Sequence, residues 1–255
     1  MTAAKRPATP PRLSVLLASE APVGVVFRRG PSKFVRVILW DRKRDKFKSG
    51  QWFKGRIYAA ESDLSPDGHH MIYFAMGGVK WAIPETGGTW TAISQVPSLK
   101  ALTLWGQGGT TRGGGGQFTS NKSYWLNLTF DSFRIRDGSG LRRVEYRPAL
   151  SRRERAGWVQ KQTPAGYMHE KALPKGWTLR ETERHRYELE QPEDEIKLSF
   201  PTWEWAEWDR SRLVWAEDGL LRAAKLGAHK LGTIRTLYDF NAMNLPPRSA
   251  GASRK

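Results

Sequence analysis

The apolar residues of this chain occur in short blocks, and stretches of Gly, Pro, Asp and Ser separate one block from the next. Few segments keep a helical apolar period for three turns, whereas the blocks are rich in the β-branched and aromatic residues that strands favour. The sequence therefore predicts an all-β protein. The segments with the strongest strand pattern are residues 13–18, 23–27, 34–40, 71–76, 101–105, 123–130, 212–216 and 234–240.

An internal repeat favours one particular all-β architecture. The clearest pair is DGHHMIYFA at 67–75 and DRSRLVWAE at 209–217, each with an Asp, three turn residues, two apolar residues and an aromatic ring. Their offset, 209 − 67 = 142 residues, equals three units of about 47, near the roughly 40–50 residues of a four-stranded propeller blade. Weaker copies near residues 21, 119 and 153 raise the number of expected units to five.

The last unit has the clearest blade pattern. It contains four short segments separated by turns: WEWAEWD, RLVWAEDG, LLRAAKLG and TIRTLYDF. Together with the SPDG turn at 65–68, these segments resemble the blades of TolB-type and WD40-like β-propellers, in which such a turn joins the inner strands. Trp-Asp dipeptides occur at 40–41 and 208–209, without a Gly-His element at the expected distance. We expect an irregular β-propeller, most simply of five four-stranded blades, with a two-sheet or six-bladed fold as the alternatives.

One β-propeller domain is expected over residues 13–245, because all-β chains of this length commonly form a single unit. Residues 1–12 and 246–255 are rich in small, basic and Pro positions, which predicts disordered basic tails. The run Leu13–Ala18 follows basic residues, as in a signal peptide, but it is shorter than the roughly 7–15 apolar residues that such a segment needs. We expect it to be a first strand that pairs with the last blade.

The residue types that the chain lacks exclude several kinds of site. There is no Cys, so no disulfide, thiolate metal site or thiol nucleophile is expected. The five His residues are scattered, and the side chains of the adjacent pair His69 and His70 would diverge, so neither a metal site nor a cofactor is predicted. No stretch approaches the roughly 18 apolar residues of a membrane span. We expect no membrane association and a cytoplasmic location.

The WEWAEWD segment offers one catalytic hypothesis. On a strand, Trp203, Trp205, Glu207 and Asp209 share a face, and Glu204 lies beside them. Carbohydrate-binding and glycoside-hydrolysing sites need an aromatic platform beside carboxylates, so Glu204, Glu207 and Asp209 are the catalytic candidates of an alternative function. Packing of the Trp rings between blades, with the acids in turns, is the favoured interpretation.

The tract GQGGTTRGGGGQF at 106–118 has the glycine content of a phosphate-binding loop. It lacks the Lys-Ser/Thr end of a P-loop and has no strand-loop-helix context, so no helix dipole would stand behind a bound phosphate. A flexible loop between blades, able to close over a partner, is the expectation.

Charge points to a class of partner. The net charge is 42 − 25 = +17, which favours polyanionic partners through long-range attraction. From Arg28 to Arg56 eleven basic residues stand against two acids, and from Arg134 to Lys161 nine stand against three, whereas residues 181–195 contain seven acids and two Arg. Strand edges guarded by solvated Lys and Arg would give a similar pattern without any partner.

The favoured function is a non-catalytic adaptor or scaffold whose basic surface binds a protein partner or complex subunits, or, as the second choice, nucleic acid. The oligomeric state and the identity of the partner stay open. The partner-binding candidates are the basic residues of the two positive segments: Arg28, Arg29, Lys33, Arg36, Arg42, Lys43, Arg44, Arg142, Arg143, Arg152 and Arg153.

Overall fold

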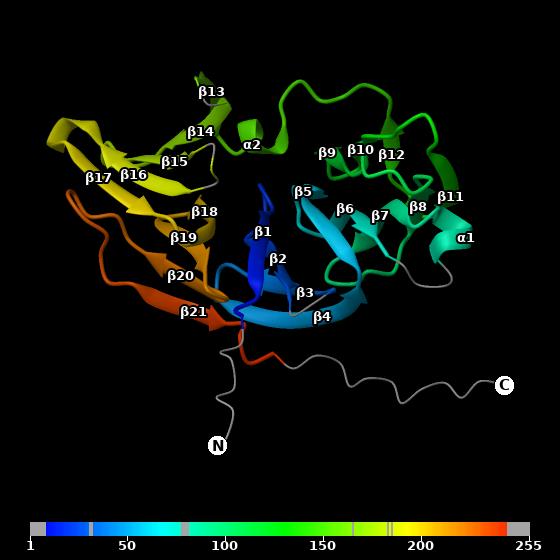
Figure 1. The fold of residues 1–255 in the computed structure, drawn as a ribbon, viewed down its shortest axis with the longest axis horizontal. Helices are drawn as coiled ribbons and strands as arrows, with labels where there is room; N and C mark the ends of the chain where they lie inside the picture. The colour runs from blue at the N-terminus through cyan, green and yellow to red at the C-terminus, as the bar shows by residue number, and fades with distance from the viewer. Residues whose placement is uncertain are drawn as a thin grey trace, which may run out of the picture.

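The computed structural model describes residues 9–30, 33–77, 82–164, 166–182, 184 and 186–243, and it confirms the all-β prediction. Strands account for 56% of the structure and helices for 4%. The described residues form five sheets of three to five strands (Figure 1). Most of the predicted tails, 1–8 and 246–255, lie outside the described residues. No helix in the described part of the chain is long and apolar enough to cross a membrane.

The sheets are named here by their strands. The first sheet contains, in order, β1 (Arg12–Leu17), β2 (Val23–Arg29), β3 (Phe34–Asp41) and β4 (Lys46–Lys54). The second contains β5 (Arg56–Leu64), β6 (His70–Met76), β7 (Thr89–Gln95), β8 (Thr103–Gly106) and β11 (Phe133–Asp137). The third contains β9 (Gly116–Ser120), β10 (Ser123–Leu126) and β12 (Arg142–Val144), and β12 runs parallel to β10.

The remaining sheets come from the C-terminal half of the chain. The fourth sheet contains β13 (Val159–Thr163), β14 (Gly166–Ala172), β15 (Thr178–Glu181), β16 (Tyr187–Gln191) and β17 (Ile196–Phe200). The fifth contains β18 (Trp203–Asp209), β19 (Arg212–Glu217), β20 (Leu220–Ala224) and β21 (Arg235–Asp239), the four strands predicted for the last unit. The helical segments are short: α1 (Ala82–Thr86), α2 (Arg152–Arg155) and a 3-10 turn at Pro192–Asp194.

The sheets follow one another in the manner of propeller blades. Strand β1 lies beside β5 on one side and beside β18 on the other, while β5 contacts β9 and β16 contacts β18. The spatial order of the sheets is therefore third, second, first, fifth and fourth, as Figure 1 shows. Only the first and fifth sheets have the expected four strands. The irregular propeller-like architecture is thus as predicted, and the uniform blade size is not.

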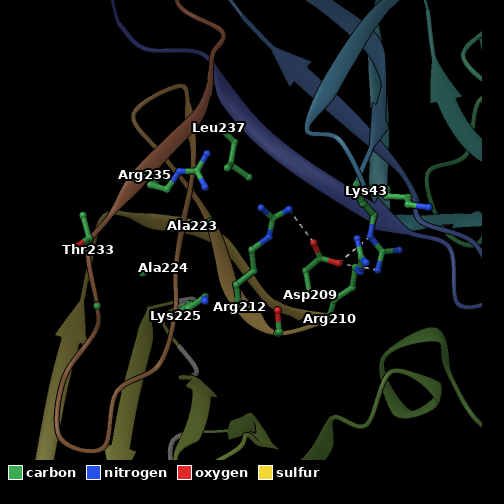
Figure 2. Close-up of a pocket in the computed structure, with 13 residues that line it drawn as sticks. Lys43, Asp209, Arg210, Arg212, Ala223, Ala224, Lys225, Thr233, Arg235 and Leu237 are labelled. Atoms are coloured by element: carbon green, nitrogen blue, oxygen red, sulfur yellow. Dashed lines mark hydrogen bonds and ion pairs between the residues drawn. The ribbon is translucent and has the colours of Figure 1, made fainter.

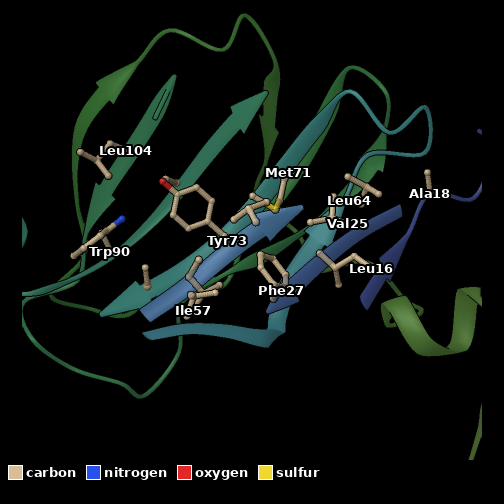
Figure 3. Close-up of a cluster of buried hydrophobic side chains, with 14 residues drawn as sticks. Leu16, Ala18, Val25, Phe27, Ile57, Leu64, Met71, Tyr73, Trp90 and Leu104 are labelled. Carbon is tan, nitrogen blue, oxygen red and sulfur yellow. The ribbon is translucent and has the colours of Figure 1, made fainter. Parts of the chain in front are cut away.

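The apolar cores lie between neighbouring sheets, which explains why some strands are apolar without interruption. Along β1, Val15 packs into a core shared with the fifth sheet, and Leu16 packs into a core shared with the second. Along β6, Met71 and Tyr73 face the first sheet (Figure 3), whereas Ile72 faces β9 and β10. A strand buried on both faces needs apolar residues at consecutive positions.

Helix α2 stands where the sequence repeat predicted another strand hairpin near residue 153. Ser151 and Glu154 form a capping box, which fixes the start of the helix. Arg155 donates to the Phe118 carbonyl at 2.6 Å and to Asp63 at 2.9 Å, and Arg153 pairs with Glu181 of β15. The helix therefore connects the second and third sheets to the fourth, and the prediction of a hairpin here was wrong.

Two other expectations need correction. The first strand was expected to pair with the last blade, but β1 pairs antiparallel with β2 along its length and adds no strand to the fifth sheet. It contacts that sheet through the packing of Val15 and through a hydrogen bond from Leu13 N to a Glu204 carboxylate oxygen at 2.7 Å. The strand predicted over 123–130 ends at Leu126.

The glycine tract connects the second and third sheets, as expected for a loop between blades; Gly108, Gly109, Thr111 and Arg112 are exposed, whereas its end at residues 114–116 is close-packed. Gly114 and Gly115 are buried and have positive φ angles of 93° and 74°. The Gly115 N–H donates to Thr91 Oγ1 at 2.7 Å, and a Cβ at Gly115 would overlap the Glu61 carbonyl. These positions need glycine for conformation and space, because an L side chain fits neither.

Candidate anion-binding site

Two turns from opposite ends of the sequence meet at a buried carboxylate. Arg42, in the β3–β4 turn, donates to Asp209 Oδ1 from Nε at 3.0 Å and from Nη2 at 2.8 Å. Arg212 donates to the other oxygen of Asp209 at 3.2 Å and to both oxygens of Asp45 at 2.7 Å. The side chain of Asp209 is fully buried, so the two guanidinium groups supply the neutralisation that a buried carboxylate requires.

The pKa values of this cluster follow from its contacts. Burial alone would raise the pKa of Asp45, but hydrogen bonds from Arg212 and Trp40 together with the Arg212 charge hold it below its ordinary value. The bonds that Arg212 donates to Asp45 raise the pKa of the guanidinium in turn. Asp45 and Arg212 are therefore both ionised at neutral pH.

Each of these two turns also carries a cationic side chain that is not bound to Asp209 or Asp45. Asp41 Oδ1 accepts the N–H groups of Lys43 at 2.9 Å and Arg44 at 3.2 Å, an arrangement that fixes the β3–β4 turn. In the β18–β19 turn, Arg210 adopts a left-handed conformation with a φ of 63°. The side chains of Lys43 and Arg210 are both exposed.

A hollow of about 560 Å³ lies against this cluster and is bordered by six cationic side chains and one acidic one. Figure 2 shows Asp209 and Arg212 in its middle, with Arg235 on one side and Lys43 on the other. Its apolar lining comes from Ala223, Ala224 and Leu237. The cations around it are Arg42, Lys43, Arg210, Arg212, Lys225 and Arg235. We call this feature the cationic hollow.

Four of these six cations form no ion pair within the described part of the chain, although the charge of Arg235 acts on Asp45 from a longer distance. Arg42 and Arg212 are paired with carboxylates, whereas Lys43, Arg210, Lys225 and Arg235 have no ion pair with any residue in the described ranges. A concave surface with one sign of charge raises the local concentration of oppositely charged groups. The hollow can therefore hold an anion with two or more charges, and its lining offers no thiol.

The structure places nine of the eleven predicted partner-binding residues on different parts of the surface. Arg42 and Lys43 border the cationic hollow. Arg29, Lys33 and Arg44 are exposed elsewhere on the first sheet, and Arg142 and Arg143 are exposed on β12 of the third. Arg152 and Arg153 lie in α2 and line a second cavity together with Arg42. These residues therefore do not make one continuous patch.

Arg28 is a correction to the sequence prediction. It is only 2% exposed, and its guanidinium donates to the carbonyl of Phe240 at 3.0 Å, to Met243 at 3.5 Å and to Gly30. Burial lowers its pKa, with a smaller contribution from the charge of Arg36. Arg28 anchors the C-terminal segment to β2, so it cannot contact an external partner. Arg36 is half-buried, with its guanidinium over the Trp52 ring at 5.2 Å.

Sequence reasoning missed Arg210, Arg212, Lys225 and Arg235. They lie outside the two segments with the greatest net positive charge, so a count of charge along the chain did not select them. The one available signal was the turn sequence DRSR at 209–212, in which Arg210 and Arg212 stand where the matching turn has Gly68 and His70. Only the fold brings these residues next to Arg42 and Lys43.

The three carboxylates of the alternative catalytic hypothesis do not converge. Asp209 is enclosed by Arg42 and Arg212, whereas Glu207 accepts from Trp158 Nε1 at 2.8 Å and pairs with Lys171 in a different cavity. Glu204 accepts from Leu13 N at the edge of β18. A register shift between Trp203 and Trp205 places these rings in different cores, so the expected shared face is absent.

Comparisons with known proteins are sparse. No family model and no curated protein matches the chain. Among solved structures, the chain is similar to a prolyl endopeptidase, with 8% identity and a TM-score of 0.30 over 88% of this chain and 35% of that one. It is also similar to an uncharacterized protein from Listeria monocytogenes EGD-e, with 8% identity and a TM-score of 0.27 over 88% of this chain and 66% of that one.

The chain thus spans about a third of the first structure's length and about two thirds of the second's. Its own sheets define the class: an all-β protein of propeller-like architecture.

Proposed function

We propose that the protein is a non-catalytic propeller-like adaptor that binds the phosphate backbone of a nucleic acid at the cationic hollow. The observation that carries the proposal is a set of four cations around one concave surface that form no ion pair with any described carboxylate: Lys43, Arg210, Lys225 and Arg235. Arg and Lys side chains bind phosphate oxygens through charge-assisted hydrogen bonds, and such contacts supply most of the sequence-independent affinity for nucleic acids.

The surroundings of these cations support a phosphate ligand over an apolar protein surface. Six of the side chains that border the hollow are cationic and one is acidic, so its charge favours an anionic ligand over an uncharged apolar surface. An acidic protein segment could use the same charges, and the binding experiment distinguishes it. The proposal includes a cytoplasmic location for the adaptor.

The resemblance to TolB-type and WD40-like blades belongs to the same proposal. It is supported by the two matched sequence motifs, which occupy equivalent places: residues 67–70 join β5 to β6, and residues 209–212 join β18 to β19. In both sheets the preceding strand is an edge strand that lies beside another sheet. In this proposal the partner binds to the turns and faces of the blades, because a propeller fold alone does not determine function.

The test is equilibrium binding of a fluorescent DNA duplex, a single-stranded RNA and polyglutamate to the full chain. We expect the nucleic acids to bind more tightly than polyglutamate, and we expect the triple variant Lys43→Ser, Arg210→Ser, Arg235→Ser to lose most of this affinity. A matched control removes three exposed cations without side-chain ion pairs in the described structure: Lys100→Ser, Arg112→Ser, Lys122→Ser. Preferential binding of polyglutamate would instead assign an acidic protein partner.

A further inference from the structure

A second cavity, of about 370 Å³, lies where strand β1, the end of β5, helix α2 and strands β14, β16 and β18 come together. Its volume lies within the roughly 300–1,000 Å³ of small-molecule sites. Apolar and aromatic side chains make up much of the lining, including Trp158, Tyr187, Trp205 and Trp208. We call it the central cavity. It is separate from the cationic hollow, and Arg42 borders both.

The carboxylates of the central cavity are already bound to protein groups. Asp63 accepts from Arg155 at 2.9 Å and from the Phe118 N–H at 2.8 Å. Glu207 accepts from Trp158 at 2.8 Å, from its neighbour's backbone N–H at 2.9 Å and from Lys171. Asp63 therefore neutralises Arg155, and Glu207 neutralises Lys171. Neither carboxylate is available as a general acid or a general base for chemistry on a ligand.

Arg152 is the exception among these charged groups. Arg153 pairs with Glu181 and Arg155 pairs with Asp63, but the guanidinium of Arg152 makes no hydrogen bond or ion pair with any residue that the structure describes. It is half-buried at the cavity wall, where desolvation and the charges of Arg153 and Arg155 lower its pKa. The charges of Asp63 and Glu207 act in the opposite direction, and the guanidinium stays protonated.

The local structure holds Arg152 in place for a ligand. Its two anchored neighbours, Arg153 and Arg155, tie α2 to separate sheets, and the Ser151 capping box fixes the start of the helix. The planar guanidinium presents two parallel N–H groups, which match the two oxygens of a carboxylate or a phosphate. A site built on such a fixed element loses less entropy on binding.

We propose that the central cavity binds a small organic anion, whose carboxylate or phosphate oxygens pair with Arg152 and whose planar apolar part contacts the Trp side chains of the lining. One anionic group is expected, because Arg152 is the single cation of the lining without a protein partner among the described residues. The remaining charges cancel in pairs. This site is independent of the nucleic-acid proposal, since Arg152 does not border the cationic hollow.

The experiment measures binding to the full chain by tryptophan fluorescence and by calorimetry. The probes are benzoate and phenyl phosphate, which share the ring and differ in the oxyanion, and benzyl alcohol, which keeps the ring without charge. We expect at least one anion to bind about tenfold or more tightly than benzyl alcohol, because a hydrogen-bonded charge pair supplies that difference. The stronger of the two anions identifies the acid class.

The variants are Arg152→Gln, Arg152→Lys and the exposed control Arg29→Gln. We expect Arg152→Gln to weaken anion binding about tenfold or more, Arg152→Lys to weaken it less, and Arg29→Gln to leave it unchanged. Duplex binding should be the same in all of them, which separates this site from the cationic hollow. The proposal is wrong if benzyl alcohol binds as well as the anions, if no anion binds at millimolar concentration, or if Arg152→Gln binds them like wild type. The comparison of the anions with benzyl alcohol needs only wild-type protein.

Discussion

Arg42 and Asp209 form a buried ion pair, with the Arg42 Nη2 atom 2.8 Å from Asp209 Oδ1, and they lie 167 residues apart in the sequence. The third nitrogen of Arg42 donates to three backbone carbonyls between β1 and β2, the shortest at 2.7 Å to Ala18. One side chain thus connects the β3–β4 turn, the β1–β2 connection and the β18–β19 turn. Arg42 borders both cavities, but its donors are used inside the protein.

The first prediction concerns this pair. Arg42→Gln should lower the free energy of unfolding by about 3–5 kcal/mol, because it leaves the buried Asp209 carboxylate with one cation fewer and removes the bonds from Arg42 to three backbone carbonyls. The matched control is Arg44→Gln in the same turn, where the pair with Asp41 is exposed and should contribute about 0–1 kcal/mol. Urea denaturation measures both. Similar losses in the two variants would contradict a structural role for Arg42.

The second prediction concerns crowding in the glycine tract. Gly115 and Gly140 both have positive φ, at 74° and 69°, so alanine should cost about 1–2 kcal/mol at either position from conformation alone. At Gly115 the new Cβ also overlaps Glu61, whereas no atom lies within 4 Å of a Cβ at Gly140. We expect Gly115→Ala to lower stability by about 3 kcal/mol or more in total. Equal losses for the two variants would show that the tract is not close-packed at Gly115.

The third prediction concerns acid stability. The folded-state pKa of Asp45 lies below its ordinary value, so the ion pair with Arg212 stabilises the fold above the unfolded-state pKa of about 3.9. This stabilisation is lost as the pH falls through the folded-state pKa. Between about pH 6 and about pH 3, Asp45→Asn should therefore lose less unfolding free energy than wild type does. Asp131→Asn, at an exposed position, should behave like wild type. An unchanged pH dependence in Asp45→Asn would count against the coupling.

The sequence predicted those parts of the fold that short apolar blocks and turn residues specify. The four strands of the fifth sheet and the β5–β6 turn were predicted because local residues determine them. Helix α2 was not, since four residues carry too little periodicity and its position depends on ion pairs with distant sheets. The pairing of β1 with β2 was also missed, because β1 is apolar on both faces and its pattern selects neither neighbouring sheet.

The candidate sites were predicted less well than the fold. Charge density along the chain selected Arg28, which is buried, and missed Arg210 and Arg235, which border the cationic hollow. Whether an Arg neutralises a buried carboxylate or faces solvent depends on residues far away in the sequence. A binding test that replaces Arg42 together with its neighbours would therefore confuse loss of folding with loss of contact.

The last prediction is the salt dependence of nucleic-acid binding. If the cationic hollow contacts the backbone, the logarithm of the binding constant should fall linearly with the logarithm of salt concentration, by about 0.9 for each phosphate neutralised on duplex DNA. Replacing Lys43, Arg210 and Arg235 with Ser should make this slope less negative by about 2 to 3, because up to three phosphate contacts are lost.

The control variant with Lys100, Arg112 and Lys122 replaced by Ser loses the same net charge from other parts of the surface. The slope of its binding constant against salt concentration should change little. These three cations are scattered over the surface and are not positioned to contact phosphates. Fluorescence anisotropy across a salt series, with circular dichroism to verify the fold of each variant, makes the measurement. Equal slopes for the two variants, or no wild-type binding at about 0.15 M salt, where the Debye length is roughly 8 Å, would refute nucleic-acid binding at this site.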